Sequence, residues 1–270
     1  MTRLHYFQGR GRAETTRWML AVSQIAFENV PVDTPEALAT LRATGKLPFD
    51  QMPLLEIDDL NLSQSTAMIR YLARRGDYYG ETDADALWCD MIAGAVADFA
   101  ETAMQAAFQP TKESALATLQ GRFEKFGPRF EARLAENNSG FCVGARLTFA
   151  DVVLAEALTA YLDWAPGILV DTPLLAALHD RVLNAPGIAR YLHSEQRYRW
   201  QVMTMWLMSP KSCSERSQRM YPIQIGLFPY DDGRLISSCI RESCRTSRSS
   251  APDVRPGPGH VAKEVLAHLE

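Results

Sequence analysis

The chain has 270 residues, of which 47% are hydrophobic and 22% charged, so it is long enough for two modest globular domains. A formal net charge of −4 excludes a chain-wide basic surface for nucleic acid, and no run of about 18 consecutive apolar residues is present to span a membrane. The five cysteines are odd in number and the first residues lack the apolar core of a secretory signal, so we expect a cytoplasmic protein.

Alternating and helical apolar spacing predicts an α/β layer in residues 1–77. The expected elements are a strand at 2–7, a helix at 12–24, a strand at 26–32, a hairpin of strands at 52–58 and 60–62, and a helix at 63–75. The strand–helix–strand start favours a right-handed crossover between parallel strands. We therefore expect the order βαβ followed by ββα.

Residues 84–200 predict an all-helical second domain, joined to the first by a linker at 78–83. Its apolar residues recur at about 3.6-residue spacing, and the breaks carry proline or glycine. The expected helices are 84–108, 113–135, 148–164, 173–183 and 186–193. After about Trp200 the periodicity fails and serine and proline become frequent, so we expect a low-order tail at 201–270.

Tyr6 ends the first expected strand, directly before the glycine-rich, cationic turn "QGRGR". A tyrosine in a strand is most often a packing residue. However, the end of a strand in an open α/β layer is also where ligands bind, and the hydroxyl can donate a hydrogen bond to an anion. Gly9 and Gly11 would leave room for close approach, and Arg12 would add positive charge. Both interpretations of Tyr6 are open at this point.

Two further stretches are compatible with a peptide ligand. Pro53 precedes an expected strand and is either a plain loop proline or a cis-proline that leaves the backbone of Met52 free to pair. Ser65, at the start of an expected helix, is either a simple N-cap or part of a carboxylate site with Gln64.

Other motifs carry structure rather than chemistry. Thr148 and Asp151 have the spacing of a capping box, which we interpret as structural. The cysteines and histidines have no standard ligand spacing, so we expect no metal site.

Four stretches together resemble the cytosolic glutathione transferases, with features of the alpha and sigma classes, over roughly residues 3–198. They are "LHYFQGRGRAETTRW", "QMPLLEID", "LSQSTAMIRYLAR" and "LTFADVVLAE". The resemblance implies a thioredoxin-like N-terminal domain, an all-helical C-terminal domain, glutathione as co-substrate without a metal, and a role in detoxification. It covers nothing beyond Trp200.

The resemblance also implies residue roles. Tyr6 matches the catalytic tyrosine that stabilises the glutathione thiolate, and Arg12 matches the arginine that assists it. The glutathione-binding positions are Tyr6, Arg12, Arg42, Lys46, Gln51, Met52, Pro53, Gln64, Ser65, Asp98 and Lys125, with Pro53 as the cis-proline. Asp98 and Lys125 match residues that reach the partner subunit's glutathione, although Lys125 replaces an arginine. The hydrophobic substrate pocket would contain Phe7, Gly9, Met104, Gln105 and Phe108. Arg10 and Arg17 are expected to be structural.

Phe49 matches a loop aromatic that inserts into the partner subunit, so the resemblance implies a homodimer. The implied reaction conjugates glutathione to small hydrophobic electrophiles or reduces organic peroxides, with no nucleic-acid or membrane partner. The resemblance leaves two alternatives. One is a glutathione-dependent isomerase such as a prostaglandin D synthase, and the other is a non-catalytic ligand-binding or crystallin-like relative. Retention of Tyr6, Arg12 and Ser65 speaks against the non-catalytic alternative.

Overall fold

The computed structural model describes residues 1–106 and 109–198. Phe108 and the predicted tail at 201–270 therefore lie outside the described residues. All described residues belong to one unit, Met1–Leu227, so the predicted domain boundary at 78–83 stays a prediction.

The N-terminal part is a four-stranded sheet in the order β2-β1-β3-β4. The strands are β1 (Thr2–Tyr6), β2 (Phe27–Pro31), β3 (Leu54–Ile57) and β4 (Leu60–Ser63). β1 and β2 are parallel, whereas β1–β3 and β3–β4 are antiparallel. The predicted parallel pairing of β1 with β2 and the predicted hairpin are both confirmed, and this arrangement is a thioredoxin-like fold.

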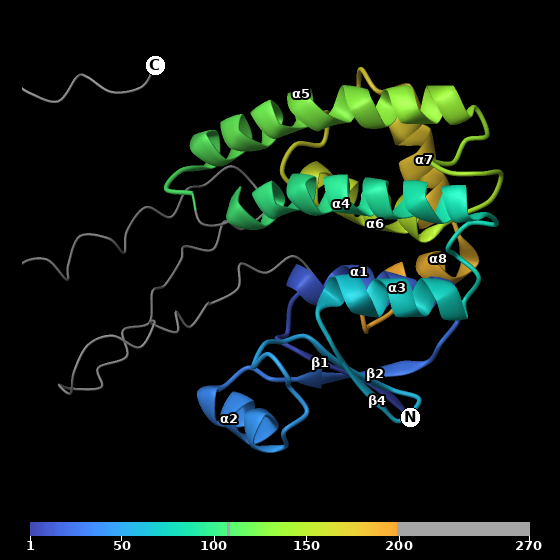
Figure 1. The fold of residues 1–270 in the computed structure, drawn as a ribbon. Helices are drawn as coiled ribbons and strands as arrows, with labels where there is room; N and C mark the ends of the chain where they lie inside the picture. The colour runs from blue at the N-terminus through green and yellow to red at the C-terminus, as the bar shows by residue number, and fades with distance from the viewer. Residues whose placement is uncertain (107–108, 199–270) are drawn as a thin grey trace, which may run out of the picture. The chain divides into compact units, whose positions relative to one another are not determined.

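Helices cover both faces of the sheet (Figure 1). The 3₁₀ turn η1 (Gly11–Ala13), α1 (Glu14–Val22) and α3 (Ser65–Arg75) belong to one side, and α2 (Pro35–Ala43) to the other. Because neighbouring strand residues point to opposite faces, Leu55 packs in the core with α1 and α3, whereas Leu54 packs against α2. The predicted order omitted α2, although Thr34 caps it by accepting a hydrogen bond from the Ala37 N–H.

The second part consists of helices, as predicted. They are α4 (Asp83–Ala106), α5 (Lys112–Asn137), α6 (Phe149–Leu162), α7 (Pro173–Leu183) and α8 (Pro186–Leu192). α6 is its central helix, and the Tyr161 ring stacks on Phe99 of α4 at a centroid distance of 4.0 Å. The capping box is confirmed, since buried Asp151 accepts hydrogen bonds from the N–H groups of Thr148 and Cys142.

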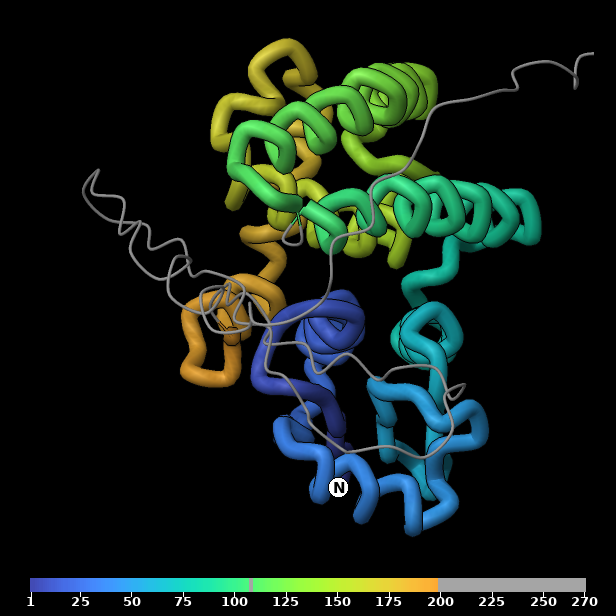
Figure 2. The backbone as a smooth tube through the Cα atoms, turned by 90° about the vertical axis from the view of Figure 1, so that its left-hand side faces the viewer, coloured from blue at the N-terminus to red at the C-terminus, as the bar shows by residue number. Residues whose placement is uncertain are grey.

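The last described helix returns to the first domain. Figure 2 shows α8, in orange, next to the blue α1. The Tyr191 hydroxyl donates to the Glu14 carboxylate at 3.1 Å, which joins the two. Within residues 1–106 and 109–198, no helix combines the length and apolarity of a membrane crossing, and no group of three or more potential ligands is placed to hold a metal.

Candidate active site

Tyr6 has a buried ring and a hydroxyl at the turn after β1. Its side chain packs edge-on against Phe7, and the residue is only 6% exposed. The hydroxyl oxygen accepts a hydrogen bond from the Arg12 backbone N–H at 3.1 Å. Burial raises the pKa of Tyr6, opposed by that hydrogen bond and by the charges of Arg12 and Arg17. The hydroxyl therefore keeps its proton at neutral pH, and that proton is available to an anion.

Gly11 leaves space for the side chain of Tyr6, a role that the sequence analysis did not predict. Its φ is +42°, and a Cβ there would lie 2.7 Å from the Tyr6 hydroxyl. The position that a Cβ would occupy is thus taken by Tyr6 itself, while Gly11 also lines the cavity described below, so its role in admitting a ligand stays a prediction. A glycine is needed here both for the backbone conformation and for the position of the tyrosine.

The buried side chain of Arg17, which is 1% exposed, stabilises the turn after β1. Its guanidinium donates to the carbonyl of Gly9 at 2.9 Å and to the Glu14 carboxylate at 3.0 Å. Arg10 forms an ion pair with Asp163. These contacts confirm the structural interpretation of both arginines.

The side chain of Arg12 extends from the turn to α4. Its guanidinium pairs with the Glu101 carboxylate at 3.0 Å. Sequence reasoning did not identify Glu101, because nothing near it in the chain connects it to the turn.

The cis-proline interpretation is confirmed, since the Met52–Pro53 peptide bond is cis. Gln64 occupies the N-cap position of α3 with a φ of 67°, and its amide donates to Gln51 at 2.9 Å. Ser65 is the first residue of α3, so the N-cap interpretation of Ser65 was wrong by one position. The left-handed backbone of Gln64 explains the shift, because it ends β4 abruptly and starts the helix.

Of four further residues predicted to contact glutathione, two form ion pairs with neighbouring carboxylates and two are exposed side chains on helices of the second part. Arg42 forms an ion pair with Asp50 at 2.6 Å, and Lys46 with Glu56. The Lys46 hydrogen bond is the main reason why the pKa of Glu56 is lowered. The other two, on α4 and α5, are exposed side chains: Asp98 and Lys125.

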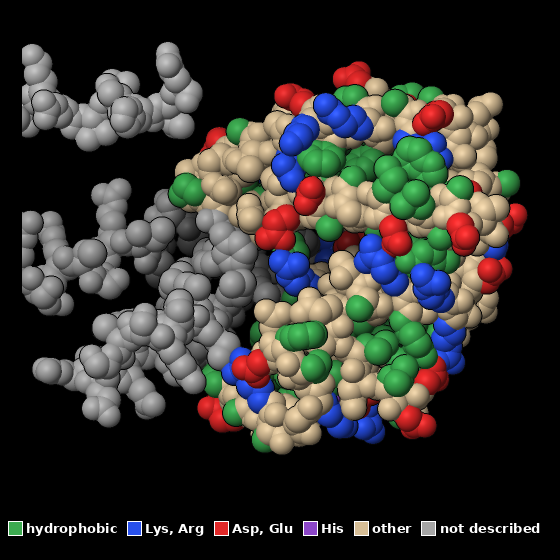
Figure 3. Space-filling view, viewed as in Figure 1, with side chains coloured by type: hydrophobic (Ala, Val, Ile, Leu, Met, Phe, Trp, Pro, Cys, Tyr) green, Lys and Arg blue, Asp and Glu red, His purple; other side chains and the backbone are tan. Residues whose placement is uncertain are grey.

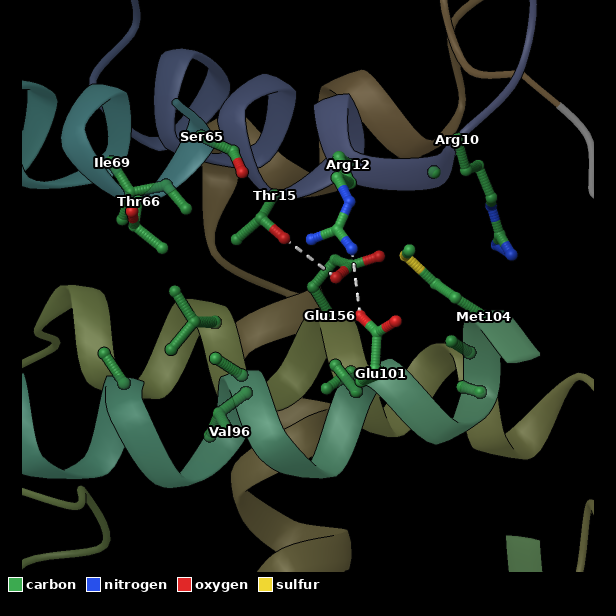
Figure 4. A pocket seen from close by; sticks show the side chains of 18 of the residues that line it. Arg10, Arg12, Thr15, Ser65, Thr66, Ile69, Val96, Glu101, Met104 and Glu156 are labelled. Atoms are coloured by element: carbon green, nitrogen blue, oxygen red, sulfur yellow. Dashed lines mark hydrogen bonds and ion pairs between the residues drawn. The ribbon is translucent and has the colours of Figure 1, made fainter. Parts of the chain in front are cut away.

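A cavity of about 160 Å³, called the central cavity below, opens between α1 and α3 on one side and α4 and α6 on the other. Figure 3 shows the surface hollowed there, with basic and acidic side chains around the opening. Of the predicted site residues, it is lined by Arg12, Ser65 and Met104 (Figure 4). Phe7, Gly9 and Gln105 lie outside its lining. Thr15 and Glu156 line it and were missed by the sequence analysis.

A thioredoxin-like sheet with a cis-proline before β3, followed by a helical domain, defines the class of fold. Residues 2–74 match the N-terminal domain model of glutathione S-transferase, and residues 97–195 match its C-terminal domain model. The chain therefore belongs to the glutathione S-transferase family and is a transferase that conjugates glutathione.

Individual relatives agree with this assignment. The chain is 38% identical to glutathione S-transferase alpha-3 of Rattus norvegicus over 192 residues, which cover 70% of this chain and 87% of the relative. It is 36% identical to glutathione S-transferase A1 of Bos taurus, covering 70% of this chain and 86% of the relative. None of these matches favours the isomerase or the non-catalytic alternative.

Solved structures agree as well. The glutathione S-transferase of Ascaris lumbricoides matches with a TM-score of 0.64 and 28% identity, covering 71% of this chain and 96% of that chain. Na-GST-3 of Necator americanus, which is described as monomeric, matches with a TM-score of 0.65 and 27% identity. This match covers 72% of this chain and 97% of that chain.

Proposed function

We propose that Tyr6 and Arg12 form the thiol end of a glutathione site, and that the enzyme transfers glutathione to small hydrophobic electrophiles. The observation that carries this proposal is the Tyr6 hydroxyl, which accepts from the Arg12 N–H and retains a proton to donate. A free thiol has a pKa of about 8.5, so little thiolate exists at neutral pH. A hydrogen bond from Tyr6 and the nearby charge of Arg12 favour the thiolate. The thiolate then attacks the electrophilic carbon, forming a C–S bond as the leaving group departs.

The rest of glutathione would lie along the loop before β3 and the start of α3. The backbone of Met52 would pair with the peptide beside Pro53, and Gln64 and Ser65 would bind the γ-glutamyl carboxylate. Arg42 and Lys46 are held by Asp50 and Glu56, so contacts to the glycine end require these ion pairs to exchange. Each pair has one side chain that is well exposed, Asp50 at 66% and Lys46 at 42%, from which solvent can reach the pair during such an exchange.

The catalytic role is tested by conjugation of glutathione to chlorodinitrobenzene. Tyr6→Phe should lower kcat/KM about 10- to 100-fold, the value of one hydrogen bond to a charged group. Tyr71→Phe is the matched control, because that hydroxyl on α3 donates to Asp58 instead. A Tyr6→Phe enzyme with full rate would contradict the role of Tyr6, and wild type that binds glutathione without turnover of any electrophile would contradict the transferase proposal.

We also propose a cytoplasmic homodimer in which Asp98 and Lys125 reach the partner's glutathione. Support comes from exposed apolar side chains, chiefly Phe49, which is 64% exposed, and Leu87 and Met91 on α4. Light scattering should give a dimer for wild type and a monomer for Phe49→Ala. Val170→Ala, at another exposed apolar position, should remain dimeric. A monomeric wild type would contradict the proposal.

A further inference from the structure

The central cavity extends beyond the candidate glutathione site. From Arg12 and Met104 it continues past Val96 toward Thr66 and Ile69 (Figure 4). The inner part is mainly apolar, with Ala93 and Val153 in its lining. A cavity of about 150 Å³ is large enough to hold a benzene ring.

The charged side chains around this cavity are paired with one exception. Arg12 is bound by Glu101 at 3.0 Å, Arg70 by Asp90 at 2.7 Å, and Arg10 by Asp163. The exception is Glu156 on α6, which has no ion pair within the described residues.

Glu156 faces the cavity from an otherwise apolar stretch of helix. One carboxylate oxygen accepts a hydrogen bond from the Thr15 hydroxyl at 2.9 Å (Figure 4). Among the described residues, no hydrogen bond reaches the other oxygen. Burial raises the pKa of Glu156 to about 7, and the charge of Glu14 adds to this, whereas the Thr15 hydrogen bond and the charge of Arg10 oppose it. Among the described residues no cation forms an ion pair with this carboxylate, although such a pair would stabilise its ionised form.

We propose that the central cavity binds small hydrophobic amines, whose protonated nitrogen hydrogen-bonds to Glu156 while the apolar part lies among Ile69, Val96 and Val153. An ammonium group supplies both the charge and the donors that this carboxylate lacks. An anion is disfavoured, because it would meet Glu156 and find the arginines already paired. The inference does not rest on the roles assigned to Tyr6 or to the electrophile.

Benzylamine is a suitable probe because its single ring fits the volume. Calorimetry would measure its binding to the full chain saturated with glutathione, which occupies the glutathione site without placing an alkyl chain in the central cavity. We expect benzylamine to bind at least about tenfold more tightly than benzyl alcohol, which has the same shape without the charge. Glu156→Gln should abolish this preference, while leaving benzyl alcohol binding unchanged.

Two matched variants locate the site. Glu101→Gln removes a cavity carboxylate that already has a partner, so it should retain the preference for the amine. Ala93→Leu should weaken both probes by filling the inner cavity. Equal binding of the two probes to wild type, or loss of the preference in Glu101→Gln rather than in Glu156→Gln, would overturn the proposal.

If Glu156→Gln does not fold, the pH dependence of benzylamine binding to wild type tests the proposal instead. Benzylamine affinity should rise between about pH 6 and about pH 8, where Glu156 ionises and the amine stays charged. The charged groups around Glu156 are Glu14 on α1, Arg10 before η1, Arg12 in η1, Asp163 after α6 and Glu101 on α4. An affinity that does not change over this range would overturn the proposal.

Discussion

Replacing Gly11 with alanine tests whether the turn after β1 positions the Tyr6 hydroxyl. The new Cβ would lie 3.0 Å from the ring carbon Cε1 and only 2.7 Å from that hydroxyl, which is closer than real Cβ contacts, so the tyrosine must move. Its hydrogen bond with the Arg12 N–H would then be strained or lost. The φ of +42° adds backbone strain of about 1–2 kcal/mol to the folded state.

The two effects can be separated with Gly45→Ala. Gly45 has a φ of +70°, and no atom lies within 4 Å of the position that a Cβ would occupy, so its substitution introduces strain without a clash. Both variants should lose about 1–2 kcal/mol of unfolding free energy in urea. Only Gly11→Ala should lose about tenfold or more in kcat/KM for chlorodinitrobenzene, because small displacements of a catalytic group are costly.

A double variant sharpens the test. Tyr6→Phe removes the hydroxyl oxygen, which is the atom nearest to the position that the new Cβ would occupy. Gly11→Ala should therefore lower kcat/KM much less in the Tyr6→Phe enzyme than in wild type. If Gly11→Ala and Gly45→Ala lower kcat/KM equally, or if the Gly11→Ala effect is the same in both backgrounds, the positioning argument is refuted.

Three further changes have expected outcomes. Arg17→Met leaves Glu14 buried without its cation, and urea unfolding should show a loss of about 3–5 kcal/mol. Asp151→Ala deprives the buried N–H groups of Thr148 and Cys142 of their acceptor, so thermal unfolding should show a loss of about 2–4 kcal/mol. The pKa of Glu156 is raised from 4.5 to about 7, so its ionisation destabilises the fold as pH rises through that range. Glu156→Gln should remove this decline of about 3 kcal/mol, and equal pH profiles for the variant and wild type would contradict the assignment.

The sequence was sufficient for the strands, α1 and α3 of the α/β layer, because apolar residues recur in each at strand or helix spacing. α2 was missed because it is short and mostly exposed, with Leu41 as its single fully buried residue, so its periodicity is weak. The position of Ser65 was misjudged because the left-handed conformation of Gln64 depends on its tertiary setting, and glutamine has no preference that would indicate it.

The cavity residues illustrate a different limit. Thr15, Glu101 and Glu156 come from α1, α4 and α6, so no local motif joins them and only the packing of the helices brings them together. A signal was nevertheless present in "FADVVLAEALTAYL", the sequence of α6. Asp151 and Glu156 are its two charged residues, and the capping box accounts for Asp151 alone. A carboxylate without a capping role in a helix that is otherwise apolar has to be either neutral or matched by a partner. That requirement connects the raised pKa of Glu156 with the proposed amine site, because ligand and proton compete for the same carboxylate.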